Sequence, residues 1–167
     1  MTEAEAFERA ILDSPDDLNT YAAYGDWLQD RDDPRGAFIA VQLALEDSSR
    51  STGERRALQD SEARLLGDHE RGWLGALAPH LLDGDHRPRA EHWWARGFLT
   101  EVRVEALTFA FAQALAVTSA ARTLRALRIE SSLHPAYRGD AKPAALLPPG
   151  ETAYESYFEL IGSPCLE

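Results

Sequence analysis

The chain has 167 residues, a length that predicts one domain, or one small domain with part of another. Hydrophobic residues make up 44% and charged residues 27%, which excludes a collagen, a disulfide scaffold and a wholly disordered chain. The net charge is -11, and residues 1–50 supply -8 of it, with twelve acidic and four basic side chains. This balance argues against nucleic acid as a partner, because contacts to the phosphate backbone require basic residues.

The chain shows no sign of export or membrane insertion. Cys165 is the only cysteine, so no disulfide can form within the chain. No segment combines a basic flank with an apolar run, and none approaches the roughly 18 apolar residues of a membrane span. We therefore predict a cytoplasmic protein with no membrane partner.

The N-terminal part of the chain, residues 1–82, predicts a helical bundle. Thr2 and Glu5 have the spacing of a capping box, and an apolar stripe follows them. A break at residues 14–17 separates the first helix from the second, and Asp33 and Pro34 fit the N-cap and first position of the third. A charged helix should then run from Ser51 to about residue 69, before a short apolar turn that a proline ends at position 79.

The pattern changes in the second half of the chain. Residues 83–89 predict a polar loop, residues 98–105 alternate as in a strand, and residues 106–117 predict a short helix. A second strand carries Leu124, Leu127 and Ile129. Residues 134–150 should be irregular, and a helix is expected at about 151–161.

The two predicted strands share a spacing. Leu99, Val102 and Val104 fit the pattern L-x-x-L-x-L, and the second strand repeats it with a period of 25. Such a period lies within the range of leucine-rich repeats, in which each strand and its return helix stack on the next unit. An ordinary βαβ unit would give the same two matches. Because fewer than three repeats rarely hold together, we expect part of a longer protein or a divergent stand-alone version.

The N-terminal segment resembles the bacterial repeat-companion domain, a short module commonly placed ahead of leucine-rich repeats. The resemblance rests on Pro15-Asp16-Asp17, Tyr24-Gly25-Asp26-Trp27-Leu28, Asp33-Pro34-Arg35-Gly36 and Phe38-Ile39-x-x-Gln42, with sparser matches at Trp73-Leu74-Gly75 and Arg96-Gly97-Phe98. The sequence departs from the family pattern at Gly25, Asp32 and Ala37. The resemblance implies no catalysis, and it implies a structural role for the motif residues Asp26, Trp27, Asp33, Pro34, Arg35, Gly36 and Phe38.

The residues suggest three kinds of chemistry: a carboxylate–guanidinium contact, a metal site and nucleophilic or cofactor-dependent catalysis. Asp26 could accept hydrogen bonds from Arg35 or from the amides that open the third helix, which favours a structural contact over a ligand pocket. Six potential metal ligands lie close in sequence without the spacing of a known site: His80, Asp83, Asp85, His86, Glu91 and His92. No nucleophile elbow, P-loop or dinucleotide fingerprint is present, so we predict neither catalytic residues nor a cofactor.

The constant displacement between the two strands also predicts a surface. In a parallel sheet it would place Arg103 beside Arg128, Glu105 beside Glu130, and Thr100 beside Arg125. Side-by-side like charges cost stability, and a docked partner of opposite charge would relieve that cost. Alternatively, Arg128 leans diagonally to Glu105 and neutralises the row. The candidate interaction surface is therefore Arg103, Glu105, Arg125, Arg128 and Glu130.

The sequence predicts an α+β protein in which a helical module, residues 1–82, caps a short leucine-rich-repeat-like parallel sheet with return helices, residues 90–167. The predicted function is that of a non-enzymatic interaction or scaffold module that binds another protein. Self-association through the open edge of the repeats is a second expectation. Two alternatives remain: a regulatory or sensor domain that binds a small ligand or metal in the loop at residues 80–92, and an acidic decoy that inhibits a nucleic-acid-binding protein.

Overall fold

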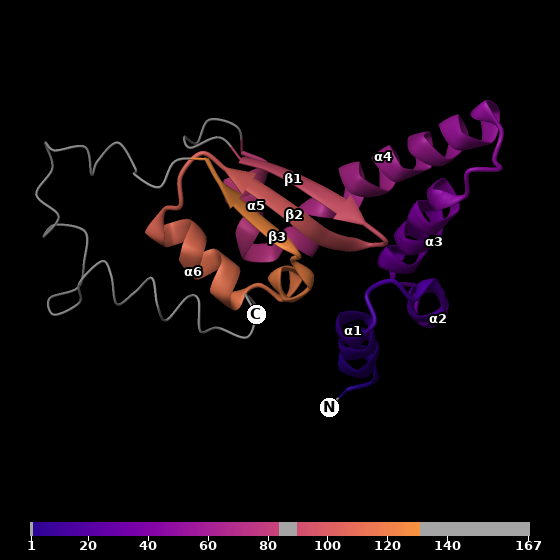
Figure 1. The fold of residues 1–167 in the computed structure, drawn as a ribbon, viewed down its shortest axis with the longest axis horizontal. Helices are drawn as coiled ribbons and strands as arrows, with labels where there is room; N and C mark the ends of the chain where they lie inside the picture. Colours follow the sequence, from indigo (N-terminus) through magenta and orange to yellow (C-terminus); the bar gives the residue numbers. More distant parts are fainter. Residues whose placement is uncertain (1, 84–89, 131–167) are drawn as a thin grey trace, which may run out of the picture. The chain divides into compact units, whose positions relative to one another are not determined.

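A computed structural model of the chain describes residues 2–83 and 90–130. The fold is α+β, with N-terminal helices followed by a small three-stranded sheet (Figure 1). In chain order the elements are α1 (Glu3–Asp13), α2 (Leu18–Gln29), α3 (Pro34–Glu46), α4 (Thr52–Leu74), the 3-10 helix η1 (Gly75–Leu77), α5 (Ala78–Leu81), β1 (Ala90–Ala95), β2 (Phe98–Val104), α6 (Phe109–Val117), the 3-10 helix η2 (Ser119–Thr123) and β3 (Ala126–Ile129). Within the described ranges, no helix is both long and apolar enough to cross a bilayer.

Local capping explains where the N-terminal helices begin. The Thr2 hydroxyl accepts from the Glu5 amide at 3.2 Å and the Glu5 carboxylate accepts from the Thr2 amide at 2.6 Å, which confirms the predicted capping box. Asp33 caps α3 by accepting from the Arg35 amide at 2.9 Å, and Pro34 opens the helix as predicted. A second capping box joins Ser51 and Glu54 at the start of α4.

Two predicted helix boundaries were wrong. Helix α4 continues to Leu74 rather than ending near residue 69, because its last turn is packed: Trp73 stacks on Phe38 and Leu74 is fully buried. Pro79 does not end the following turn but occupies the first turn of α5, where a missing N–H costs no hydrogen bond.

The sheet has the order β1-β2-β3 and is mixed, so the predicted all-parallel sheet was wrong. The difference is strand β1, which was not predicted from the sequence. A two-residue turn at Arg96 and Gly97 joins β1 to β2, and both residues have positive φ angles, 52° and 83°. Such a turn favours a hairpin, because its twist matches that of the two flanking strands.

Strands β2 and β3 pair in parallel with the predicted displacement. Val102 lies opposite Leu127 and Val104 opposite Ile129, with α6 in the connection between the strands. In β2, burial steps by three positions from Leu99 to Val102 and then by two to Val104. The L-x-x-L-x-L spacing therefore describes the burial of β2 better than the strict alternation first expected.

The chain forms two compact units, and the hairpin contributes to both. Of the described residues, the first comprises residues 2–73 and the hairpin tip, residues 94–99. The second comprises residues 74–83, 90–93 and 100–130.

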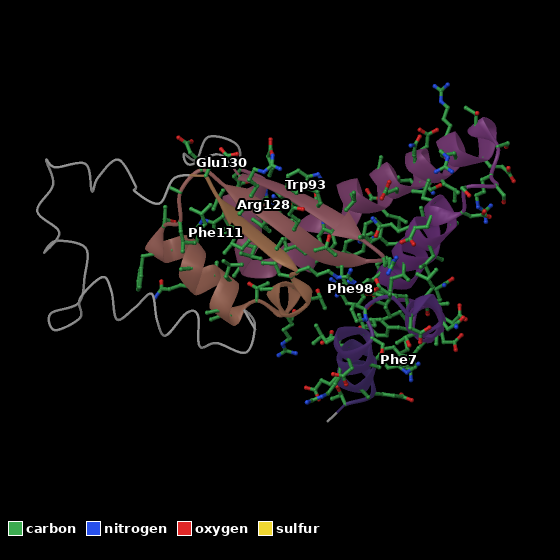
Figure 2. The ribbon with its side chains drawn as sticks, in the orientation of Figure 1. Phe7, Trp93, Phe98, Phe111, Arg128 and Glu130 are labelled. Carbon is green, nitrogen blue, oxygen red and sulfur yellow. The ribbon has the colours of Figure 1, made fainter. Side chains whose placement is uncertain are left out.

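The core of the first unit combines α1, α2 and α3 with the hairpin tip. Its buried members are Ile11, Tyr21, Tyr24, Leu28, Ile39 and Phe98, with Phe7, Trp27 and Leu43 packed against them. Figure 2 labels Phe7 and Phe98 of this group. A second aromatic group stacks Phe38 on Trp73 with ring centroids 4.9 Å apart, and Trp94 meets both rings edge-on. The hairpin tip is therefore part of the hydrophobic core of this unit.

Helices α2 and α3 approach closely because Gly36 faces Gly25. A Cβ atom at Gly36 would lie 2.5 Å from the Gly25 carbonyl oxygen and 2.8 Å from the Gln29 amide nitrogen. Neither backbone atom can move without separating the helices. Gly36 of the family-like motif thus has a steric role at this crossing.

Candidate interaction surface

An exposed face of the sheet gathers one aromatic and four charged side chains. We call it the open sheet face and define it by five residues, Glu91, Trp93, Glu101, Arg103 and Arg128, all in the second unit. Trp93 on β1 is 41% exposed and presents a large apolar ring on this face. Figure 2 labels Trp93 and Arg128, which lie on the two outer strands.

Arg103 links β2 to β1 across this face. Its Nη1 donates to a Glu91 carboxylate oxygen at 3.0 Å. Its guanidinium carbon also lies 5.0 Å from the centre of the Trp93 ring, within the range of a cation–π interaction. The Arg103 side chain therefore contacts two residues of β1 while it remains 38% exposed.

Arg128 links β3 to β2. The register places Arg103 directly opposite Arg128, which confirms the predicted pair of like charges. The Nε of Arg128 donates to a Glu101 carboxylate oxygen at 2.6 Å. The predicted diagonal contact to Glu105 was therefore wrong. Glu101 lies on β2 two positions before Arg103, and its carboxylate is the one that accepts the hydrogen bond from Arg128.

The remaining predicted surface residues lie at the ends of the paired strands. The Glu130 amide donates to the Val104 carbonyl at 2.9 Å, so the register extended by one position brings Glu105 opposite Glu130. At the other end the Arg125 amide donates to the Thr100 carbonyl at 2.9 Å. The structure thus brings all three predicted pairs together in register, although only the pair of Arg103 and Arg128 lies within the bounds of both strands.

The predicted contact between Asp26 and Arg35 was wrong. Asp26 is exposed on α2, and its side chain makes no hydrogen bond or ion pair with any residue that the structure describes. Arg35 instead lies near two aromatic rings, with its guanidinium carbon 5.5 Å from Phe98 and 5.9 Å from Trp73. Burial lowers the pKa of Arg35, and its Nε has no hydrogen-bond partner in the described part of the chain.

The other motif residues have structural positions in the first unit. Trp27 packs between Tyr24 and Phe7, and its indole N–H donates to Glu3 at 2.8 Å. Arg31 stacks over the Trp27 ring at 3.9 Å. Asp33 and Pro34 begin α3, Gly36 permits the helix crossing, and Phe38 is fully buried.

Gln42 and the hairpin tip form a buried polar contact whose importance was not predicted from the sequence. The Gln42 Oε1 accepts from the Gly97 amide at 2.6 Å, while its Nε2 donates to Glu62 at 2.8 Å and to the Trp94 carbonyl at 3.3 Å. Arg96 donates to both carboxylate oxygens of Glu46 and to the Pro15 carbonyl. The hydrogen bond to Glu46 raises the pKa of Arg96. The sequence signal for this contact was Gln42 itself, a polar residue on the side of the helix that the apolar pattern predicts to be buried.

No metal site is formed by the residues whose positions the structure describes. Groups of three or more possible ligands are absent from residues 2–83 and 90–130. Asp85 and His86 of the predicted ligand loop lie outside these ranges, as do the predicted irregular segment at 134–150 and the predicted helix at 151–161.

Comparison with known proteins gives no relative. No family model matches the chain, and neither the curated proteins nor the solved structures contain a match.

Proposed function

We propose that the chain is a non-enzymatic protein-interaction module of the repeat-companion and leucine-rich-repeat type, which binds another protein through the open sheet face. The observation that carries this proposal is the exposed Trp93 with Arg103 held over it, beside the second arginine of the neighbouring strand. Tryptophan and arginine are the residue types that most often dominate binding energy at protein interfaces. We assign no catalytic residue and no cofactor to this face.

The repeat assignment is supported by the parallel pair of strands. The L-x-x-L-x-L spacing of both strands and their displacement of 25 residues fit a short repeat unit, while the parallel pairing and connecting helix are shared with an ordinary βαβ unit. Strand β1 precedes this pair and carries Trp93, so it extends the exposed face by one strand. The bacterial repeat-companion assignment of residues 1–82 rests on the sequence motifs, whose residues have the structural positions described above.

The ion pairs explain how the face can be charged and still stable when no partner is bound. Two arginines directly opposite each other would repel. Glu91 and Glu101 each supply a carboxylate to one of them, at 3.0 and 2.6 Å. Because these pairs are exposed, each contributes roughly 0–1 kcal/mol, and a partner can replace either carboxylate at little cost.

A pull-down from the lysate of the native host tests this function. The bait is the full chain, compared with the double variant Arg103→Ser, Arg128→Ser at low and moderate salt. The matched control is Arg56→Ser, Arg64→Ser, which removes two exposed arginines of α4. We expect one partner that the wild type and the control retain at both salt concentrations and that the double variant loses. Retention of that partner by the double variant would refute binding through the open sheet face.

A further inference from the structure

Helix α6 exposes an apolar face that no part of the proposed function uses. One side of the helix is buried and contains Phe111, which Figure 2 labels. The Phe111 ring meets the His80 ring edge-on with centroids 5.5 Å apart. The opposite side is exposed, with Phe109 53% and Val117 76% accessible. We call this side the outer α6 face, and its exposed members are Phe109, Ala110, Gln113, Ala116 and Val117.

The outer α6 face is symmetric about its centre. Gln113 is the middle residue of the nine-residue helix, with Ala110 three positions before it and Ala116 three positions after it. Phe109 and Val117, four positions away on each side, are both large and apolar. If a second copy packs antiparallel about a two-fold axis at Gln113, alanine therefore meets alanine and Phe109 meets Val117. The pattern thus has the self-complementarity that a two-fold interface requires.

The single polar side chain of this face suits the same arrangement. Gln113 makes no side-chain hydrogen bond to any described residue. A glutamine amide both donates and accepts, so two copies that meet at a two-fold axis can bond to each other. The alanines on either side allow the helix backbones to approach closely enough for these bonds to form.

Charge also permits a second copy at this face. The chain carries -11, but α6 has no charged residue, so this face is one that two copies can join without placing acidic side chains of the helix in contact.

We propose that the chain self-associates as a two-fold dimer through the outer α6 face, with the two copies of α6 antiparallel and Gln113 at the axis. One short helix from each copy buries less than the roughly 1,200 Å² of a standard stable interface. The dimer should therefore be weak and should depend on concentration. It leaves the open sheet face available, and it does not depend on the proposed function of that face.

Sedimentation of the full chain from about 10 µM to about 1 mM, the range in which weak association is measurable, tests the dimer. We expect reversible dimerisation that Val117→Asp weakens at least tenfold, because symmetry places the new carboxylate at the interface twice. The control Leu18→Asp changes an equally apolar, 44% exposed side chain of α2 and should dimerise as the wild type does. A wild type that stays monomeric throughout this range overturns the proposal. If the wild type is monomeric and Val117→Asp lowers its free energy of unfolding, the proposal is also overturned, because the face then makes contacts within the chain.

Disulfide trapping tests the position of the axis independently of the stability of Val117→Asp. In a Cys165→Ser background, Gln113→Cys should oxidise to a covalent dimer much faster than Ser119→Cys, an exposed position beyond the helix end. Equal rates for the two cysteines would overturn an axis at Gln113. Circular dichroism confirms that each variant is folded.

Discussion

Replacement of Gln42 by methionine tests whether the hairpin tip is held by a buried polar contact. Methionine preserves the length of the side chain and removes all three of its hydrogen bonds. The Gly97 amide, which donates to Gln42 at 2.6 Å in a buried position, would lose its acceptor at a cost of about 1–3 kcal/mol. Loss of the bonds to Trp94 and Glu62 adds about 1–2 kcal/mol, because Glu62 is only half-buried and can be hydrated.

The expected loss is about 1–4 kcal/mol, after about 1 kcal/mol is recovered from burial of the apolar methionine. At roughly 2–4 °C per kcal/mol for a chain of this size, the melting temperature should fall by about 2–16 °C. Thermal and urea unfolding followed by tryptophan fluorescence measure both quantities. The control Gln59→Met changes an exposed glutamine of α4 and should stay within about 0.5 kcal/mol of the wild type. Equal effects of the two substitutions would refute the reasoning.

Four further substitutions have expected outcomes. Gln42→Glu keeps an acceptor for Gly97 but places a carboxylate against that of Glu62, so urea unfolding should show a loss of stability from the repulsion of the two like charges. Gly36→Ala should lower the melting temperature far more than Gly25→Ala, because its Cβ would lie 2.5 Å from a backbone oxygen, whereas that of Gly25 would lie 3.3 Å from a side-chain methyl. Asp17 has a pKa lowered mainly by the hydrogen bond from the Thr20 hydroxyl, so the stabilisation by its carboxylate is present above the unfolded pKa of the group and is lost as the pH falls through the folded pKa. The stability difference between wild type and Asp17→Asn should therefore disappear in acid-unfolding curves. The double variant Arg103→Ser, Arg128→Ser should lose less than about 2 kcal/mol in urea, since both ion pairs are exposed, and a larger loss would mean that these arginines stabilise the sheet.

The helices of the first unit could be predicted because their signals are local. Thr2 with Glu5, and Asp33 with Pro34, specify helix starts through bonds between near neighbours in sequence. The pairing of β2 with β3 could also be predicted, since L-x-x-L-x-L occurs twice and its displacement fixes the register. Strand β1 has no comparable signal. Trp93 and Trp94 are adjacent and point to opposite faces of the strand. Because the exposed position holds a tryptophan rather than a polar residue, the sequence does not show the alternation of apolar and polar residues that indicates a strand.

The contacts of the candidate surface could be predicted only in part. The register determines that Arg103 and Arg128 are neighbours, but the choice between Glu101 and Glu105 depends on side-chain geometry. The error at Arg35 has a similar cause. Asp26 is close in sequence, whereas the rings of Phe98 and Trp73 come from distant segments and approach only in the folded chain. Unlike β2 and β3, these segments share no repeated spacing that could indicate their contact.

The insertion of the hairpin tip into the first unit makes that unit discontinuous in sequence. A fragment that ends at residue 82 lacks Phe98 and Trp94, so it would expose the aromatic rings that these side chains cover and leave Gln42 buried beside an empty site. The N-terminal helices therefore cannot complete their own core until the chain has been synthesised past residue 99. During translation this unit would remain unfinished while the intervening segment emerges, and evolution could not transfer it to another protein without the hairpin that completes it.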